Sequence, residues 1–487
     1  MNQSSINRKA TSGILWTTIQ KFASISLTFI SGIILARLLS PTDYGTIGVL
    51  TIFIMVSEAF IDGGFGSALI QKKHPTQEDY STIFWWNLVM AVFLYLILFF
   101  SAPYIAIYFK DSILCPVLRV HALTLLIVAF NTIQYNQLKK KFQFKSLAIV
   151  TLVSSFISLL ITIILAYLNF GVWALVIQGL TNSLFQTIYY WYKSKWRPDF
   201  TFSVYSFRKL ASFGIFIFLT KSINELCNNV QGILIGRYFN ASIMGFYSKA
   251  KSTEKLASTS ISSSLNQVTY PIYAELQDDI PALINMIRKI VLMIAFITFP
   301  LMYLLILEAK EIFILLYSDK WIDSVPYFQI LCFAGAAQCL QAANLQPINA
   351  IGKSKTTFTW NLLKRFIGIN MVIGGFIFYD IEGLLIGMVC NSWMLYLINA
   401  CMVSKYIGYS LSSQFKDLFP ILFVSLISLY LTYIINNQFS FTLYVNGIIK
   451  LIVFCSIYYL SVRTFKLKAY DSFMALLPIV ITKIKRR

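Results

Sequence analysis

The sequence predicts an all-α, polytopic membrane protein with about fourteen transmembrane helices, six in each of two repeats and two more at the end. Hydrophobic residues make up 57% of the 487 residues, charged residues only 12%, and the mean hydropathy is +0.69. This composition is typical of proteins that cross a bilayer several times. Apolar segments long enough to cross about 30 Å of hydrocarbon also recur along the whole chain.

The repeat is visible in the stretch of residues 8–48, which recurs at an offset of 200 residues. Lys21 recurs as Lys221, and Arg37 recurs as Arg237 at the end of the same kind of apolar run. Because charged residues are rare in apolar runs, these coincidences in register predict a duplicated unit. Six spans return the chain to its starting side, so we expect the two copies to be related by an axis along the membrane normal. Lys21 and Lys221 should then face each other.

The order of the spans divides the chain into a first bundle (1–192), a basic link (193–209), a second bundle (210–404), two further spans (405–462) and a basic tail (463–487). The first apolar segment is too long for the core of a signal peptide, so it is counted as a span. Glycines at 63, 64 and 66 predict a helix terminus or hinge inside the second span. We expect spans near residues 13–38, 43–68, 81–103, 113–137, 144–168, 171–192, 210–236, 241–266, 284–307, 326–350, 356–379, 383–404, 416–435 and 442–462.

The lysines and arginines of the connections alternate along this order, and most of them fall in every second connection. Under the positive-inside rule those connections lie in the cytoplasm, and both termini are expected there too. The chain carries a net charge of +20, but its basic residues form short clusters between apolar segments, so we expect membrane topology and no nucleic-acid partner. The connections are short, which places the functional machinery within the membrane.

Other function classes are disfavoured by what the sequence lacks. The seven cysteines are scattered, without a CxxC spacing or histidines at ligand spacing, so we expect no disulfide framework, no metal site and no cofactor. A membrane glycosyltransferase or polymerase would need carboxylates or a metal on a large extracytoplasmic loop. We therefore expect no enzyme and no catalytic residues.

Basic residues inside the expected spans indicate an internal aqueous cavity, because a charge facing lipid at mid-depth costs about 2.5–3.5 kcal/mol. Snorkelling to the interface is the expected alternative for Arg119 and Lys450. Lys21 and Lys221 lie a turn or two inside their spans and recur in the repeat, which favours a cavity role. The candidates for binding an anionic substrate are Lys21, Lys221, Lys249, Lys251, Lys255, Arg37 and Arg237.

Acidic residues in the same spans are candidates for coupling transport to an ion. Glu58 and Asp62 are four residues apart, as are Lys221 and Glu225, and this spacing places each pair on one helix face. Glu254 lies beside two of the lysines of its span. An acid four residues from a base can also serve only to neutralise it, so both interpretations stay open. The coupling candidates are Glu58, Asp62, Glu225 and Glu254.

Several stretches resemble the polysaccharide-repeat-unit flippases, of the O-antigen and colanic-acid-exporter type, in the multidrug/oligosaccharidyl-lipid/polysaccharide exporter superfamily. The resemblance runs in consistent order over roughly residues 8–360, whereas the last four spans match mainly by hydropathy. Its clearest pieces are LARLLSPTDYG at 35–45, GFGSALIQ at 64–71, FQFK at 142–145, GVWALV at 171–176, WRP at 196–198, LIGR at 234–237 and AIGK at 350–353.

The resemblance implies two six-helix bundles facing each other across a central cavity that opens alternately to each side. It implies a flippase in the bacterial cytoplasmic membrane that moves an undecaprenyl-pyrophosphate-linked oligosaccharide to the periplasmic leaflet. The lipid bilayer, a coupling ion (H⁺ or Na⁺), a polysaccharide polymerase and glycosyltransferases are its candidate partners. The family has no single invariant catalytic motif, so no residue inherits a role from it.

Two alternatives share the implied fold. A drug/cation antiporter would favour an acidic cavity, whereas the intramembrane charges of this chain are mainly basic. A flippase for the lipid-linked peptidoglycan precursor would share the basic cavity and is disfavoured by the motifs alone.

Overall fold

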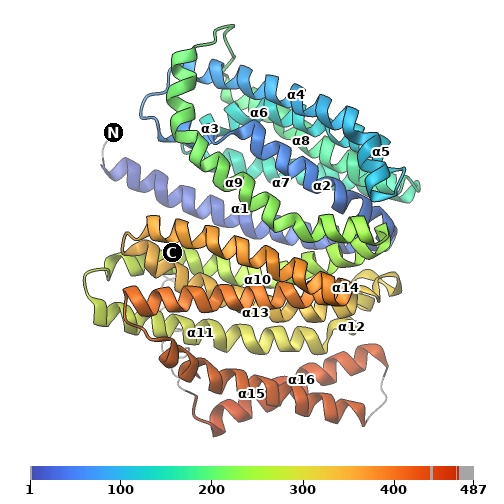
Figure 1. Cartoon of the computed structure of the whole chain (residues 1–487), viewed down its shortest axis with the longest axis vertical. Coiled ribbons are helices and arrows are strands. Elements are labelled where there is room, and N and C mark those ends of the chain that lie inside the picture. Colours follow the sequence, from blue (N-terminus) through green and yellow to red (C-terminus); the bar gives the residue numbers. More distant parts are fainter. Residues whose placement is uncertain (1–2, 439–441, 468, 471–487) are drawn as a thin grey trace. The chain divides into compact units, whose positions relative to one another are not determined.

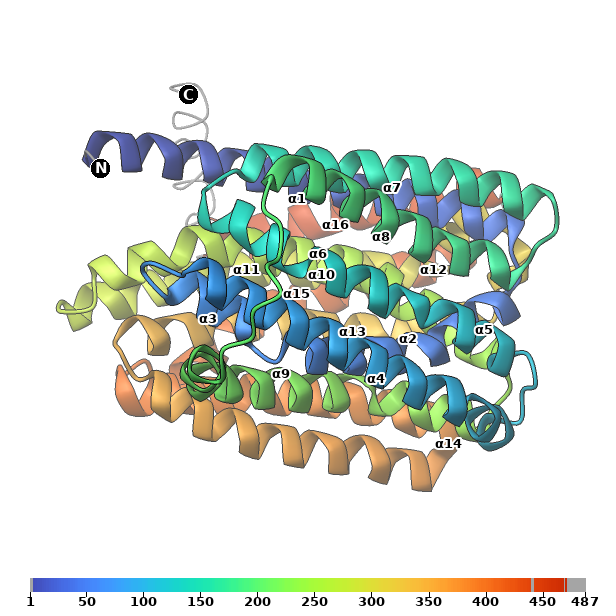
Figure 2. The same ribbon diagram turned by 90° about the horizontal axis from the view of Figure 1, so that it is seen from above.

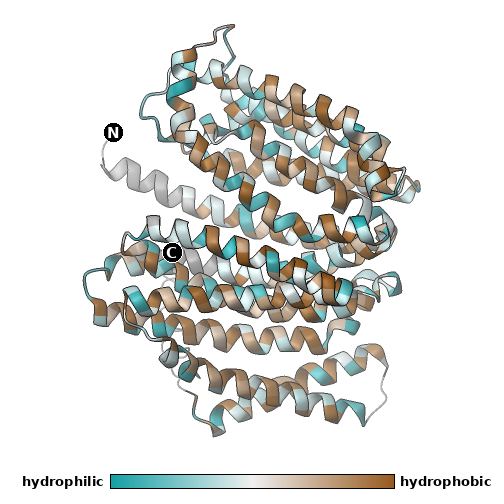
Figure 3. Cartoon of the chain, in the orientation of Figure 1, coloured by the Kyte–Doolittle hydropathy of each residue, from teal (hydrophilic) through white to brown (hydrophobic). Residues whose placement is uncertain are grey.

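A computed structural model describes residues 3–438, 442–467 and 469–470, and all regular elements in this part of the chain are helices (Figure 1). Ten of these helices are long and apolar enough to cross a membrane. Hydrophobic residues dominate the long helices, and hydrophilic residues gather in the connections (Figure 3). The predicted all-α, multi-pass fold class is confirmed. The count of fourteen spans stays a prediction, because three expected spans (171–192, 241–266 and 326–350) are outside the ten and two others (356–379 and 383–404) lie in one helix.

The chain divides into two compact units, Met1–Ser248 and Lys249–Arg487. In unit 1, α1 packs against α7 and α7 against α8, and the three run side by side (Figure 2). Helix α9 packs against α2, α3 and α4 of the first expected bundle. The helices are α1 (Gln3–Leu38), α2 (Pro41–Asp62), α3 (Phe65–Gln71), α4 (Gln77–Phe109), α5 (Leu114–His121), α6 (Leu123–Lys140), α7 (Phe144–Tyr167), α8 (Val172–Ser194), α9 (Val204–Tyr238) and the start of α10 (Ala241–Glu275).

The second expected span is broken where the glycines predicted a hinge. Gly63 and Gly64 have φ angles of 52° and 74°, a left-handed conformation that glycine adopts without a Cβ clash. Helix α2 therefore ends at Asp62 and α3 starts at Phe65. The fourth expected span is likewise divided, into α5 and α6 at Ala122.

The starts of α2 and α10 make a contact that reflects the internal repeat. The hydroxyls of Thr42 and Ser242, exactly one repeat apart, lie 2.8 Å from each other. A Cβ on Gly45 would overlap the carbonyl of Ala241, and a Cβ on Gly245 would overlap the carbonyl of Pro41. Exchanging each residue for its counterpart 200 positions away (45 with 245, 41 with 241) converts one contact into the other, so the starts of α2 and α10 meet around a local pseudo-twofold axis. The glycines are needed because backbone meets backbone here.

Unit 2 is built around α13, which packs against α11 and α14, while α15 packs against α11 and α16. Helix α14 holds two of the expected spans, because Tyr379 and Asp380 leave the helical conformation in its middle. The two halves approach closely at Gly375 and Gly383, as in a helical hairpin. The helices are α11 (Ile280–Leu307), α12 (Ala309–Tyr317), the short 3₁₀ helix η1 (Asp319–Trp321), α13 (Ser324–Ala350), α14 (Ser354–Tyr406), α15 (Leu411–Asn437) and α16 (Leu443–Thr464). The basic tail lies outside the described residues from 471 onward.

Candidate functional site

Glycine contacts hold α9 close to α2 and α3 in unit 1. A Cβ on Gly64 would overlap the carbonyl of Gly214 in α9, so the two backbones touch at the α2–α3 break. Near the other end of α9, Gly236 makes room for the side chain of Val49. Residues later in α9 thus contact residues earlier in α2, so the two helices run antiparallel. The middle of α9 consequently faces the last turns of α2.

The facing segments carry four charged residues, here named the α2–α9 charge cluster: Glu58 and Asp62 on α2, and Lys221 and Glu225 on α9. The Lys221 ammonium lies 3.3 Å from an Asp62 carboxylate oxygen. Glu58 is close enough to Lys221 and Glu225 for electrostatic interaction with both. Lys221 therefore forms its ion pair with the neighbouring helix, and the cluster contains three carboxylates and one ammonium.

The ion pair of this cluster is accessible. The Lys221 side chain is 45% exposed and that of Asp62 is 28% exposed. Exposed pairs of this kind contribute only about 0.2–1 kcal/mol. Lys221 can therefore exchange Asp62 for another anion at little cost in stability.

The other basic candidates of unit 1 lie apart from this cluster. Lys21 is on α1, which packs against α7, and the described residues include no ion-pair partner for it. No contact between Lys21 and Lys221 is described, so their facing arrangement stays a prediction. Arg37 is exposed near the end of α1. Arg237 stacks on the Tyr108 ring at 4.4 Å and donates to the Tyr108 carbonyl, which indicates an anchoring role.

In unit 2 the lysines of α10 differ in their surroundings. Lys249 is 3% exposed, and its ammonium lies 3.8 Å from the centre of the Tyr317 ring. Lys251 is half-buried and Lys255 is exposed, and Glu254, buried between them, interacts electrostatically with both. Lys249 is thus held by an aromatic ring, whereas Lys255 is accessible.

Snorkelling was the wrong expectation for Lys450. Its side chain is buried, and its ammonium donates to Glu311 over 2.6 Å. The sequence analysis did not select Glu311 or its neighbour Glu308. Their spacing of three residues, which places both carboxylates on one face of a helix, was the available signal.

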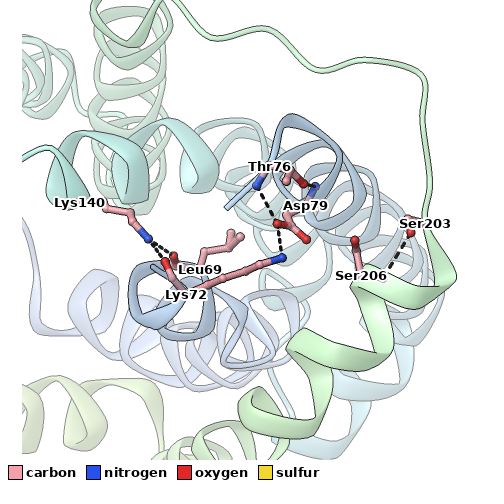
Figure 4. A network of polar contacts seen from close by, with 7 residues as sticks. All are labelled: Leu69, Lys72, Thr76, Asp79, Lys140, Ser203 and Ser206. Carbon is pink, nitrogen blue, oxygen red and sulfur yellow. Dashed lines mark hydrogen bonds and ion pairs between the residues drawn. The ribbon is translucent and has the colours of Figure 1, made fainter. Parts of the chain in front are cut away.

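A separate polar network secures the start of α9 and the expected basic link (Figure 4). Asp79, fully buried at the start of α4, pairs with Lys72 over 2.5 Å. Lys140 donates to carbonyls at the end of α3, among them Leu69. The link itself is docked on α4, where the Ser203 amide donates to the Thr82 hydroxyl over 3.0 Å. These basic residues stabilise the fold in addition to any role in topology.

The described residues include no group of three or more histidine, cysteine, aspartate or glutamate side chains arranged to hold a metal ion. The charges can instead bind anions at the accessible lysines, or exchange protons at the carboxylates. The charged residues most accessible for such chemistry are Lys221, Lys255 and the half-buried Glu58.

Known proteins place the chain in context. TuaB, a teichuronic acid biosynthesis protein of Bacillus subtilis strain 168, is 26% identical over 73% of this chain and 74% of its own length. WzxC, a lipopolysaccharide biosynthesis protein of Escherichia coli strain K12, is 22% identical over 88% of each chain.

Two solved structures share the fold. The lipid II flippase MurJ, in an inward closed conformation, has a TM-score of 0.74 at 17% identity and covers 93% of this chain and 98% of its own. An inward-facing multidrug resistance MATE transporter has a TM-score of 0.61 at 15% identity and covers 83% of this chain and 99% of its own.

A family model described as "Polysaccharide biosynthesis protein" matches residues 34–326, which is more than half of the chain. This range contains the α2–α9 charge cluster and the lysines of α10. The chain belongs to the polysaccharide biosynthesis protein family.

Proposed function

We propose that this protein is a flippase that moves undecaprenyl-pyrophosphate-linked oligosaccharide repeat units from the cytoplasmic to the periplasmic leaflet. Family membership is the observation that carries the proposal. The names of TuaB and WzxC, which refer to the biosynthesis of teichuronic acid and lipopolysaccharide, support it. So does a shared fold with a protein named as a lipid II flippase. The protein acts as a transporter and catalyses no covalent step.

The proposed location is the bacterial cytoplasmic membrane, with fourteen spans in two six-helix bundles followed by two helices. Both termini lie in the cytoplasm, as the alternating lysine clusters indicate. The two bundles alternate between inward and outward openings, in line with the inward conformations named for MurJ and MATE. A polysaccharide polymerase and glycosyltransferases act before and after the transport step.

The accessible lysines bind the substrate headgroup. A pyrophosphate cannot cross hydrocarbon unaided, and lysine supplies it with charge-assisted hydrogen bonds. Lys221 is suited to this task because its ion pair with Asp62 is exposed and weak. Lys21 contributes from α1, and Lys251 and Lys255 from α10, while Lys249, Arg37 and Arg237 have supporting roles.

The carboxylates couple transport to an ion. Glu58, Asp62 and Glu225 outnumber Lys221, so the cluster carries excess negative charge when all four groups are ionised. A proton or Na⁺ would offset that charge and release Lys221 for the substrate. Glu254 is the coupling candidate of unit 2, where it interacts electrostatically with Lys251 and Lys255 and the lysines outnumber the carboxylate.

The acidic excess also favours a second candidate, a drug/cation antiporter, since three carboxylates around one ammonium suit a cationic substrate. The shared fold with a multidrug resistance transporter is compatible with it. The lipid-linked peptidoglycan precursor is a third substrate with the same pyrophosphate chemistry.

Complementation of a strain that lacks this gene tests the proposal. Wild type should restore surface polysaccharide, and the Lys21→Glu, Lys221→Glu double variant should not, at protein levels matched by immunoblot. Lys→Arg at both positions keeps the charge and should retain much of the activity. Lys73→Glu, in an exposed connection, is the matched control. Wild-type polysaccharide from the double glutamate variant would refute the headgroup role, and drug resistance without polysaccharide would favour the antiporter.

A further inference from the structure

A second acid–base cluster lies in unit 2, where α16 packs against α11 and α12. It consists of Glu308, Glu311, Asn446 and Lys450 and is here named the α12–α16 charge cluster. The Lys450 ammonium donates to Glu311 over 2.6 Å and to the Leu307 carbonyl over 3.3 Å. The Asn446 amide donates to the same Glu311 oxygen over 3.2 Å.

The cluster is unbalanced in charge and in hydrogen bonds. Glu308 and Glu311 are only 9% and 8% exposed, and among the described residues the Lys450 ammonium is the one cation that acts on both. One buried oxygen on each of Glu308, Glu311 and Asn446 accepts no hydrogen bond from the described residues. Leaving an ionised carboxylate buried without a partner is costly. The cluster therefore lacks one positive charge and at least one hydrogen-bond donor.

A proton on Glu308 supplies both the missing positive charge and the missing hydrogen-bond donor. The protonated carboxyl is neutral and becomes an O–H donor among oxygens that lack one. An inorganic cation would instead have to sit beside the Lys450 ammonium, which repels it. Gly447 lets α16 approach the carboxyl closely, since a Cβ there would lie 3.0 Å from a Glu308 oxygen.

The electrostatics agree with this geometry. Glu308 follows the last residue of α11 and lies outside the candidate spans. Burial and the Glu311 carboxylate raise the pKa of Glu308 to about 7, against a smaller opposing effect of the Lys450 ammonium. Glu311 on α12 and Lys450 on α16 are the titratable groups that act on it. Its carboxyl group can thus gain or lose a proton near neutral pH.

We propose that Glu308 is a proton-binding site of the transport cycle, loaded from the extracytoplasmic side. The lysine pattern places the connection between α11 and α12 on that side of the membrane. The carboxylate takes a proton from water, and the resulting acid leaves Lys450 to Glu311 alone. After proton release, Glu308 competes with Glu311 for the ammonium. Protonation consequently changes how α16 is held against α11 and α12.

This inference rests on the proposed function only for its place in a cycle, because proton binding can be measured without transport. Infrared difference spectra of the purified protein in lipid should show a carboxylic acid carbonyl band that titrates near neutral pH. Part of the band should be lost in Glu308→Gln, whereas Glu382→Gln should leave its intensity unchanged. Glu382 is an exposed glutamate of the same unit and serves as the matched control.

Thermal stability gives a second readout. A raised pKa means that the fold favours the protonated form, so stability should decline as the pH rises from 4.5 through about 7. Glu308→Gln should flatten this decline, because glutamine resembles the protonated acid at all pH values. If Glu308→Gln fails to accumulate, Glu308→Asp should retain a titrating band at a shifted frequency.

The outcomes separate the two proposals. A band of unchanged intensity in Glu308→Gln would overturn the proton site and leave the flippase proposal intact. Stabilisation by Na⁺ that requires Glu308, without the band, would overturn it in favour of a sodium site. A titrating Glu308 band in a protein that fails to restore polysaccharide would instead contradict the flippase proposal.

Discussion

The two charge clusters combine the same residue types in opposite environments. In the α2–α9 cluster, Lys221 and Asp62 are 3.3 Å apart with side chains 45% and 28% exposed. In the α12–α16 cluster, the Lys450 ammonium and a Glu311 carboxylate oxygen are 2.6 Å apart, and the side chain of each residue is 10% exposed. The side chains of the first pair are partly exposed, whereas protein encloses the second pair.

This difference separates two uses of a lysine within helices. An exposed pair holds its lysine weakly, so the ammonium remains available to a passing anion. A buried pair cannot exchange its partner without exposing a charge to a low dielectric, which makes it a structural element. What remains changeable in the buried cluster is the proton on the second carboxyl, Glu308.

The largest effect on stability is expected from the substitution Lys450→Met in the buried cluster. It removes the ammonium that pairs with Glu311 and interacts with Glu308, and breaking a buried pair costs about 3–5 kcal/mol. We expect a large fall in the thermal unfolding temperature of the purified protein. The fall should shrink at acidic pH, where the carboxyls become neutral. A fall that is independent of pH would mean that lost packing, not charge, is responsible.

A smaller effect is expected from Gly214→Val. The side chain would press on the backbone at Gly63 and Gly64, and overpacking costs about 1–3 kcal/mol. Because this contact sets the spacing of α9 from α2, the distance between spin labels at positions 60 and 218 should increase. Gly374→Val is the control, since a Cβ there meets no neighbour within 4 Å. Unchanged distances would show that the glycine contact does not position Lys221.

The smallest effect on stability is expected from Asp62→Asn. Loss of an exposed ion pair should change the unfolding free energy by no more than about 1 kcal/mol. Transport should respond more clearly, because Lys221 loses a competitor for the substrate. Thermal unfolding and export measured on the same preparation would test this. A destabilisation as large as that of Lys450→Met would show that the exposed pair stabilises the fold as strongly as the buried pair does.

Periodicity and composition were sufficient to predict most of the fold. The apolar segments anticipated nearly every long helix, and the glycines at 63 and 64 marked the break between α2 and α3. Short elements were missed, since α12 and η1 lie in an expected connection. The offset of 200 residues reappears directly in the hydroxyl contact between Thr42 and Ser242.

The charged residues could be found from the sequence, but their partners could not. Spacing within one helix suggested Lys221 with Glu225, whereas packing between helices joins Lys221 to Asp62. Lys450 near a helix end resembled a snorkelling lysine because nothing local revealed Glu311, more than a hundred residues away. Pairing across helices depends on their rotation and depth, which hydropathy does not encode.

Flippase activity can be tested most directly by a leaflet assay with purified components. The protein would be reconstituted into vesicles with a fluorescent undecaprenyl-pyrophosphate oligosaccharide, and a membrane-impermeant glycosidase would report the outer leaflet. Wild type should expose inner-leaflet substrate to the enzyme, while the Lys21→Glu, Lys221→Glu variant stays near the level of protein-free vesicles. If vesicles with the wild-type protein exchange the lipid no faster than protein-free vesicles, the proposed flippase activity is contradicted.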